Sequence, residues 1–281
     1  MTRARRLTAT AAIVVAAMMA PACAQTAGTA PVSLDQLCAE TFVVACETGG
    51  TSTVVVIQEQ TPADDINRLA EQLHVVASQR AGDMVLRAEF SEPRTLDPEV
   101  APPYKWQISI EPGDTETFKT AVAGTLAAAS VPGAVGIAVI DGWPYVTVER
   151  LEQFEDVFSR VSATPLFQDG GTYTLQSLDE RLRIVHVPTR TNDDAIVEII
   201  AVARDYPNAE VLLEAPTSGP QTPTFYVSRL SPSQQHELDM RLREPRLADA
   251  DVDGYALEYV LGSTGESGTT YTSGTFGSVP G

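Results

Sequence analysis

The sequence predicts an α+β fold with two ferredoxin-like βαββαβ repeats, in which mixed or antiparallel sheets are packed by helices. Three observations support this prediction. Short apolar runs typical of strands alternate with segments whose apolar residues recur at helical spacing. The same order of segments returns in the second half of the chain, and helix-capping residues precede several helical segments. A single mixed sheet that spans both halves is the alternative architecture.

The first repeat is assigned to residues 51–142. Its Val/Ile run at 54–57 predicts a strand, and Ile66, Leu69, Leu73 and Val76 are spaced as on one face of a helix. The remaining predicted elements are strands at 84–86 and 106–110, a helix at 114–129 and a strand at 135–140.

The second repeat, residues 181–261, follows at an offset of 130 residues, which aligns Thr61 with Thr191 and Ile66 with Ile196. It contains the same order of elements. They are strands at 184–187, 211–213, 225–228 and 255–261, with helices at 196–203 and 231–243.

A βαβ connector, residues 143–180, separates the repeats, and the pattern leaves open which repeat it joins. Asp141-Gly142 between two apolar runs favours a type I′ hairpin turn. Pro144 predicts that the second strand of this hairpin is an edge strand. A helix is predicted from 151 to 161 and a strand from 172 to 176.

Helix starts are predicted from three hydroxyl residues, each followed three positions later by a side-chain acceptor: Thr61, Thr191 and Ser231. The acid pairs Asp64/Asp65 and Asp193/Asp194 fall in first helical turns. Exposed amides and the helix dipole stabilise negative charge there. We therefore interpret these acids as helix-start residues rather than as carboxylate pairs for acid–base or metal chemistry.

Residues 1–22 predict an export signal. Arg3, Arg5 and Arg6 precede an uncharged apolar segment that runs from Leu7 to Ala20 and ends in small residues. The segment is shorter than the roughly 20 apolar residues that a membrane-spanning helix needs.

The end of this signal, Ala20-Pro21-Ala22-Cys23, resembles the lipobox of bacterial lipoproteins, although Ala20 stands where that family usually has Leu, Val or Ile. The resemblance covers only the signal. It implies that Cys23 becomes the acylated first residue and anchors the chain at the outer face of the cell membrane. Cleavage after Ala24, within an Ala-x-Ala pattern, is the alternative and would release a secreted chain that begins at Gln25.

The three cysteines fit this interpretation, because lipidation of Cys23 leaves Cys38 and Cys46 as a pair. In an oxidising compartment the two are predicted to form a disulfide. A two-cysteine metal site is the alternative, but no histidine lies near in sequence. Residues 23–50 are thus predicted to be a lipidated tether that includes the Cys38–Cys46 loop.

The chain is strongly acidic. Its formal net charge of −18 becomes −21 when residues 1–22, with three arginines and no acid, are removed. Such a charge argues against nucleic acid as a partner and against electrostatic binding to an anionic membrane. Residues 262–281 are rich in Gly, Ser and Thr, carry no charge after Glu266 and are predicted to be a disordered tail.

One short run of alternating aspartates, residues 249–254, suggests a metal-binding site. Asp249, Asp251 and Asp253 alternate before Gly254, so that their carboxylates could converge on a calcium ion. An EF-hand would need an acid at the twelfth position, which is Val260. Calcium is therefore the one cofactor considered, in a loop of another kind, and an acidic solvated turn is the alternative.

No catalytic motif is complete in the sequence. His236-Glu237 begins like a zinc-binding H-E-x-x-H helix, but Met240 replaces the second histidine. The G-x-S-x-G, G-x-G-x-x-G and P-loop patterns are missing. A Ser/His/Asp triad assembled from distant positions stays open.

Four aromatic residues near prolines are candidates for a ligand patch: Tyr104, Trp106, Trp143 and Tyr145. Packing in a core or over a sheet edge is the alternative. The sequence as a whole predicts an exported cell-envelope lipoprotein that acts as a non-enzymatic binding or scaffolding module for an envelope protein or small ligand. A secreted hydrolase with an illegible site and a calcium-dependent structural module are the alternatives.

Overall fold

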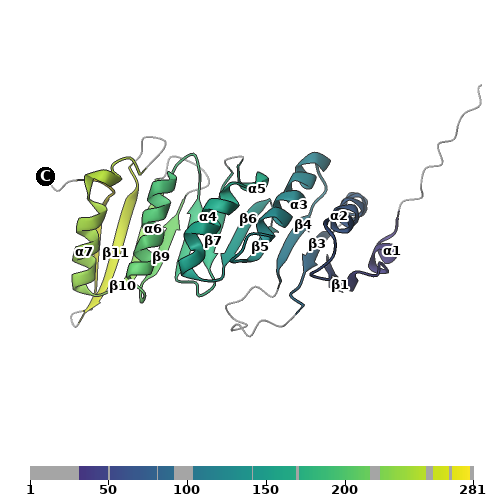
Figure 1. The fold of residues 1–281 in the computed structure, drawn as a ribbon, viewed down its shortest axis with the longest axis horizontal. Coiled ribbons are helices and arrows are strands. Elements are labelled where there is room, and N and C mark those ends of the chain that lie inside the picture. The colour runs from purple at the N-terminus through teal and green to yellow at the C-terminus, as the bar shows by residue number, and fades with distance from the viewer. Residues whose placement is uncertain are drawn as a thin grey trace, which may run out of the picture. The chain divides into compact units, whose positions relative to one another are not determined.

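The computed structural model describes residues 32–49, 51–80, 82–91, 104–140, 142–168, 171–215, 222–250, 256–265 and 268–278. The chain from Val32 onward forms one compact unit. Its strands make a single twelve-stranded mixed sheet (Figure 1). The predicted fold class, two ferredoxin-like repeats, is therefore wrong, and the alternative of one mixed sheet is confirmed.

The strands lie side by side in the order in which they occur along the chain. They are β1 (Val43–Gly49), β2 (Ser52–Ile57), β3 (Asp83–Ala88), β4 (Trp106–Ile110), β5 (Ala134–Ile140), β6 (Trp143–Val148), β7 (Tyr173–Ser177), β8 (Leu182–His186), β9 (Glu210–Glu214), β10 (Thr224–Leu230), β11 (Glu258–Gly265) and β12 (Gly268–Thr275).

Along the chain, helical segments alternate with pairs of consecutive strands. The helices are α1 (Leu34–Cys38), α2 (Ala63–Ala77), α3 (Thr115–Ala129), α4 (Phe154–Ser162), α5 (Pro165–Gln168), α6 (Asp193–Asp205) and α7 (Pro232–Leu242), with the short 3₁₀ helices η1 (Leu151–Gln153) and η2 (Pro245–Leu247).

Parallel and antiparallel pairs alternate across the sheet. Each helical connection joins two parallel neighbours, such as β2 with β3 and β8 with β9, and an antiparallel pair leads to the next unit. In a ferredoxin-like repeat another strand would separate the parallel partners. Apolar patterning shows where strands occur but not which strands pair, so it did not reveal this order. The predicted connector supplies β6, α4, α5 and β7 and lies in the middle of the sheet (Figure 1).

The prediction that Pro144 marks an edge strand is also wrong, because β6 lies between β5 and β7. Pro144 is opposite Val139 of β5, whereas the pairing of β6 with β7 starts one residue later, at Tyr145. Proline is therefore accommodated at the end of an interior strand, where the ladder to the second neighbour has not begun.

The apolar core covers one face of the sheet. Residues paired across neighbouring strands point to the same face, so the register places Val55, Leu86 and Ile108 in one row. The adjacent row continues across seven strands through Ile137, Val146, Leu175, Ile184, Leu213, Phe225 and Tyr259. All of these side chains are buried in a single cluster.

The helices pack on this same face (Figure 1), where α2 contacts α3 and α4 contacts α6. Successive βαβ units run in opposite strand directions, yet their helices stay on one face. Their crossovers must therefore alternate in hand, although right-handed crossovers are the rule. Covering one continuous apolar face thus takes precedence over the preferred hand.

Helix starts follow the predictions in part. Ser231 caps α7 in a reciprocal capping box with Gln234. The N-cap of α6 is Asn192 rather than Thr191, and α2 starts after Pro62 without a side-chain cap, so the caps predicted at Thr61 and Thr191 are wrong. The Thr61 hydroxyl instead donates to the Gln58 carbonyl oxygen at 2.8 Å, which closes the turn before the helix.

Of the tail predicted to be disordered at 262–281, residues 262–265 and 268–278 belong to the described structure and are ordered. Strand β11 extends to Gly265, and β12 pairs with it along its whole length. Phe276 is buried against Phe225 and Tyr259, and the Gln235 side-chain amide donates to the Thr270 carbonyl oxygen. These long-range contacts order a segment whose local composition favours disorder.

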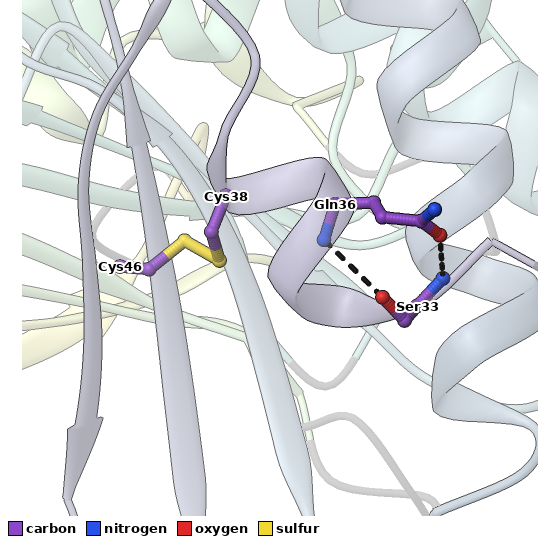
Figure 2. The surroundings of a disulfide bond; sticks show 4 residues. All are labelled: Ser33, Gln36, Cys38 and Cys46. Carbon is purple, nitrogen blue, oxygen red and sulfur yellow. Dashed lines mark hydrogen bonds between the residues drawn. A yellow bond between two sulfur atoms is a disulfide. The ribbon is translucent and has the colours of Figure 1, made fainter.

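The predicted disulfide is confirmed. Cys38 at the end of α1 is bonded to Cys46 in β1, with the two Cα atoms 5.9 Å apart (Figure 2). Helix α1 is fixed by a capping box in which the Ser33 amide donates to Gln36 Oε1 at 2.8 Å and the Gln36 amide donates to Ser33 Oγ at 3.3 Å. The bridge therefore ties a short helix to the first edge of the sheet.

Removing both cysteines with Cys38→Ser and Cys46→Ser should lower the free energy of unfolding by about 2–3 kcal/mol, because the short closed loop no longer restricts the unfolded chain. Guanidinium denaturation measures the loss. Reductant should weaken the native chain to the same extent and leave the double variant unchanged. Equal midpoints for native chain and double variant would contradict the prediction.

Candidate ligand groove on the uncovered sheet face

The face of the sheet opposite the helices carries the alternate residues of every strand. Because residues paired across strands share a face, one row contains Arg87, Gln107, Ala138, Tyr145 and Thr174. Most of these side chains are only partly buried. This face, called the uncovered face below, is therefore where side chains of the central strands can reach a ligand.

A groove of about 400 Å³ is hollowed in the uncovered face across strands β6 to β10. Each of these strands contributes to its lining. The principal side chains are Trp143 and Tyr145 of β6, Thr174 of β7, Arg183 of β8, Glu214 of β9 and Tyr226 of β10.

One wall of the groove is aromatic and fixed in position. The Trp143 indole Nε1 donates a hydrogen bond to Thr174 Oγ1 at 3.1 Å, which holds the ring against the next strand. The Tyr145 ring is tilted by 30° to it, with 6.4 Å between centroids. Thr174 is itself only 2% exposed, so this bond anchors the indole to a buried side chain. Tyr226 lines the opposite side and is 37% exposed.

The groove also contains charges of both signs. Arg183 and Glu214 are exposed on the adjacent strands β8 and β9. Both side chains line the groove, and no ion pair within the described part of the chain involves either of them. An arginine with five donors and a carboxylate with only acceptors thus face the same space.

The structure separates the four aromatic residues that the sequence grouped as a candidate patch. Trp143 and Tyr145 line the groove, whereas Trp106 is 3% exposed in the core. Tyr104 packs beneath the Arg87 guanidinium, whose central carbon lies 5.3 Å from the centroid of the Tyr104 ring, and burial raises the pKa of the Tyr104 hydroxyl.

The sequence analysis did not identify three of the groove residues: Arg183, Glu214 and Tyr226. Each of them alternates with core residues along its strand, and this alternation is the sequence pattern that could have placed them on the uncovered face.

The three histidines lie on three different elements of the described chain. His74 of α2 stacks on Phe118 at 4.6 Å, and His236 is exposed on α7. His186 of β8 is buried between the rings of Phe158 and Tyr173.

His186 does not form part of a nucleophilic triad among the residues that the structure describes. Its Nε2 lies 3.8 Å from Asp193 Oδ1, but its Nδ1 has no hydrogen-bond partner there. The nearby Ser162 hydroxyl is bonded to the Tyr173 hydroxyl at 2.7 Å instead. Burial lowers the pKa of His186 to about 4, so the ring is neutral at pH 7.

Of the predicted calcium ligands, Asp251 and Asp253 lie outside the described residues. Asp249 is exposed, and its carbonyl oxygen accepts a hydrogen bond from the Asn192 side chain that caps α6. Nowhere in the described ranges do three or more His, Cys, Asp or Glu side chains gather as a metal site. The predicted lipidation residue, Cys23, also lies outside the described residues.

Within the described residues, every helix is too short or too polar to span a membrane. Comparisons with family models, with curated proteins and with solved structures each found no significant match. What the chain does must therefore be inferred from its own residues and their geometry.

His186 should make stability depend on pH. Its pKa is about 4 in the folded chain and about 6.5 when unfolded. The unfolded chain therefore takes up a proton between these values that the native chain does not, and the free energy of unfolding falls as the pH falls from 6.5 towards 4.

Between pH 7 and pH 4.5 the native chain should lose about 2–3 kcal/mol more than His186→Phe, as measured by guanidinium denaturation. His236→Gln, at an exposed histidine, should lose as much as the native chain. The same pH dependence in native chain and His186→Phe would contradict the prediction, because it would show that folding does not lower the pKa of His186.

Proposed function

We propose that the chain is an exported cell-envelope lipoprotein, anchored through an acyl group on Cys23, and that it acts as a non-enzymatic binding module. Export is supported by the basic and apolar pattern of residues 1–22, and the anchor by the lipobox-like residues that precede Cys23. The Cys38–Cys46 disulfide is typical of an oxidising compartment.

The groove on the uncovered face is the observation that supports binding. It combines three aromatic rings, Trp143, Tyr145 and Tyr226, with the exposed charged side chains of Arg183 and Glu214. Concave sites with apolar walls and a few convergent polar groups are the usual form of small-ligand sites. The Trp143 indole is already held by a hydrogen bond, so a ligand need not order it.

An uncharged oligosaccharide fits this lining best. Aromatic faces pack against the C–H faces of sugar rings, while Arg183 donates to sugar hydroxyls and Glu214 accepts from them. The acidic chain disfavours polyanions. The floor from β6 to β10 spans four strand spacings, about 19 Å, which favours several linked rings over a single one.

Trp143 can report on binding, because the chain has only two tryptophans. In a Trp106→Phe variant, the fluorescence of Trp143 should change saturably when cellohexaose or maltohexaose is added. Adding Tyr145→Ala should weaken the affinity at least tenfold by removing half of the aromatic wall.

Ser109→Ala is the matched control, since Ser109 is on the uncovered face but in β4, outside the groove. It should leave the affinity unchanged. An unchanged spectrum at millimolar concentrations of both sugars, or an affinity insensitive to Tyr145→Ala, would refute a saccharide site in this groove.

The anchor is tested separately by the intact mass of the chain recovered from the membrane fraction without reductant. The expected mass is that of a chain starting at Cys23 with acyl groups and two hydrogens fewer for the disulfide. An unmodified chain that starts at Gln25 would instead identify a freely secreted protein.

A further inference from the structure

The two edges of the sheet differ in how they are protected. Edge strands expose unpaired backbone groups, and proteins usually protect them with charges, bulges, prolines or covering segments. At one edge, β1 contains Glu47 and an irregular register between Val43 and Ala45, and its Cys46 is bonded to α1. This edge has several features that oppose pairing with another chain.

The opposite edge, β12, has no charge, proline or register shift of its own, and the Arg243 guanidinium, which donates to the Ser273 carbonyl oxygen at 3.4 Å, is the one covering contact shown on its outer side in the described chain. Its eight residues, GTTYTSGT, contain neither a charge nor a proline, and threonine and tyrosine favour strands. Among the described strands it pairs only with β11. Tyr271 at its centre is 74% exposed.

Strand β12 is nevertheless held in an ordered conformation. Gln235 Nε2 donates to the Thr270 carbonyl oxygen at 3.3 Å, and Arg243 donates to the Ser273 carbonyl oxygen at 3.4 Å. Phe276, the residue after the strand, is 4% exposed in the core. An incoming strand would therefore meet a pre-ordered edge and would not have to order it.

The charge distribution favours a second copy of this chain as the partner. A chain of net charge −18 repels its own copies over most of its surface. No residue of β12 is charged, so pairing through this strand sets no charged side chain of one strand against the other. An antiparallel pair of identical strands is also self-complementary, as a two-fold dimer requires.

We propose that two copies of the chain pair through β12 in an antiparallel, two-fold arrangement that continues the sheet from one copy into the other. Residues opposite each other in a sheet share a face, and alternate residues of β12 lie on opposite faces. The two-fold axis must therefore pass beside a residue, and near the middle of β12 that residue is Tyr271 or Thr272.

Cysteine cross-linking tests this register in the full chain with Cys23→Ser, so that the added cysteine supplies the new thiol. Directly opposed residues have Cα atoms about 4.5–5.5 Å apart, within the range that a disulfide bridges. Tyr271→Cys or Thr272→Cys should form a covalent dimer under mild oxidation. Val44→Cys, at the 64% exposed Val44 of β1, should not.

The oligomeric state provides the second measurement, by light scattering on the Cys23→Ser chain. The expected mass is that of a dimer. Tyr271→Glu should convert it to a monomer, because two like charges would then face each other near the axis. Val44→Glu adds the same charge at the other edge and should leave the dimer intact.

A monomeric Cys23→Ser chain would overturn the proposal, as would cross-linking only between Val44→Cys and Tyr271→Cys chains, which would indicate head-to-tail pairing of β1 with β12. Circular dichroism of each variant separates loss of pairing from loss of folding. None of these outcomes affects the groove, because its lining ends at β10.

Discussion

The register of the apolar residues along the sheet is the constraint on which the rest of the structure depends. Side chains in a strand alternate between faces, so a slip of one residue would move a whole apolar set to the wrong side. Ile137, Leu175 and Phe225 belong to one row that stays on the same face through parallel and antiparallel pairs alike. Because this row is continuous, every packed helix must return over the same face, and the crossovers alternate in hand as a result. The same constraint leaves the other face without a helical layer, which is where the groove forms.

Ion pairs connect neighbouring helices in the layer above the core. The basic residues are few in this acidic chain, and several of them bridge one helical segment to the next. The pairs are Arg68 with Glu40 at 3.0 Å, Lys119 with Glu71 at 3.3 Å, Arg204 with Glu155 at 2.9 Å and Arg241 with Glu198 at 2.6 Å. The first three are exposed enough to contribute little to stability individually. Glu198 differs, because its buried carboxylate is shared by Arg241 and Arg246 and would be left unpaired if both were lost.

The groove and the β12 edge are separate features that one architecture makes compatible. The groove uses side chains of the uncovered face between β6 and β10, whereas strand pairing would use the backbone at the end of the sheet. A two-fold axis perpendicular to the sheet keeps the helices of both copies on one side and their uncovered faces on the other. Two grooves would then face the same direction, so that a long or surface-bound ligand could contact both and gain from multivalency.

The sequence by itself determined where the main strands and helices occur, because the apolar periodicity that marks them is local. It also predicted the disulfide, because the lipidation proposed for Cys23 would leave Cys38 and Cys46 as a pair. Only the tertiary structure decided which strands are neighbours, because backbone pairing between segments far apart in the sequence leaves no trace in local periodicity. It also decided the different environments of Trp106 and Trp143, which come from similar proline-flanked contexts but lie on opposite faces of the sheet. The final strand, β12, likewise depended on partners distant in sequence, since its Gly, Ser and Thr composition favours order only when β11 and α7 supply hydrogen bonds.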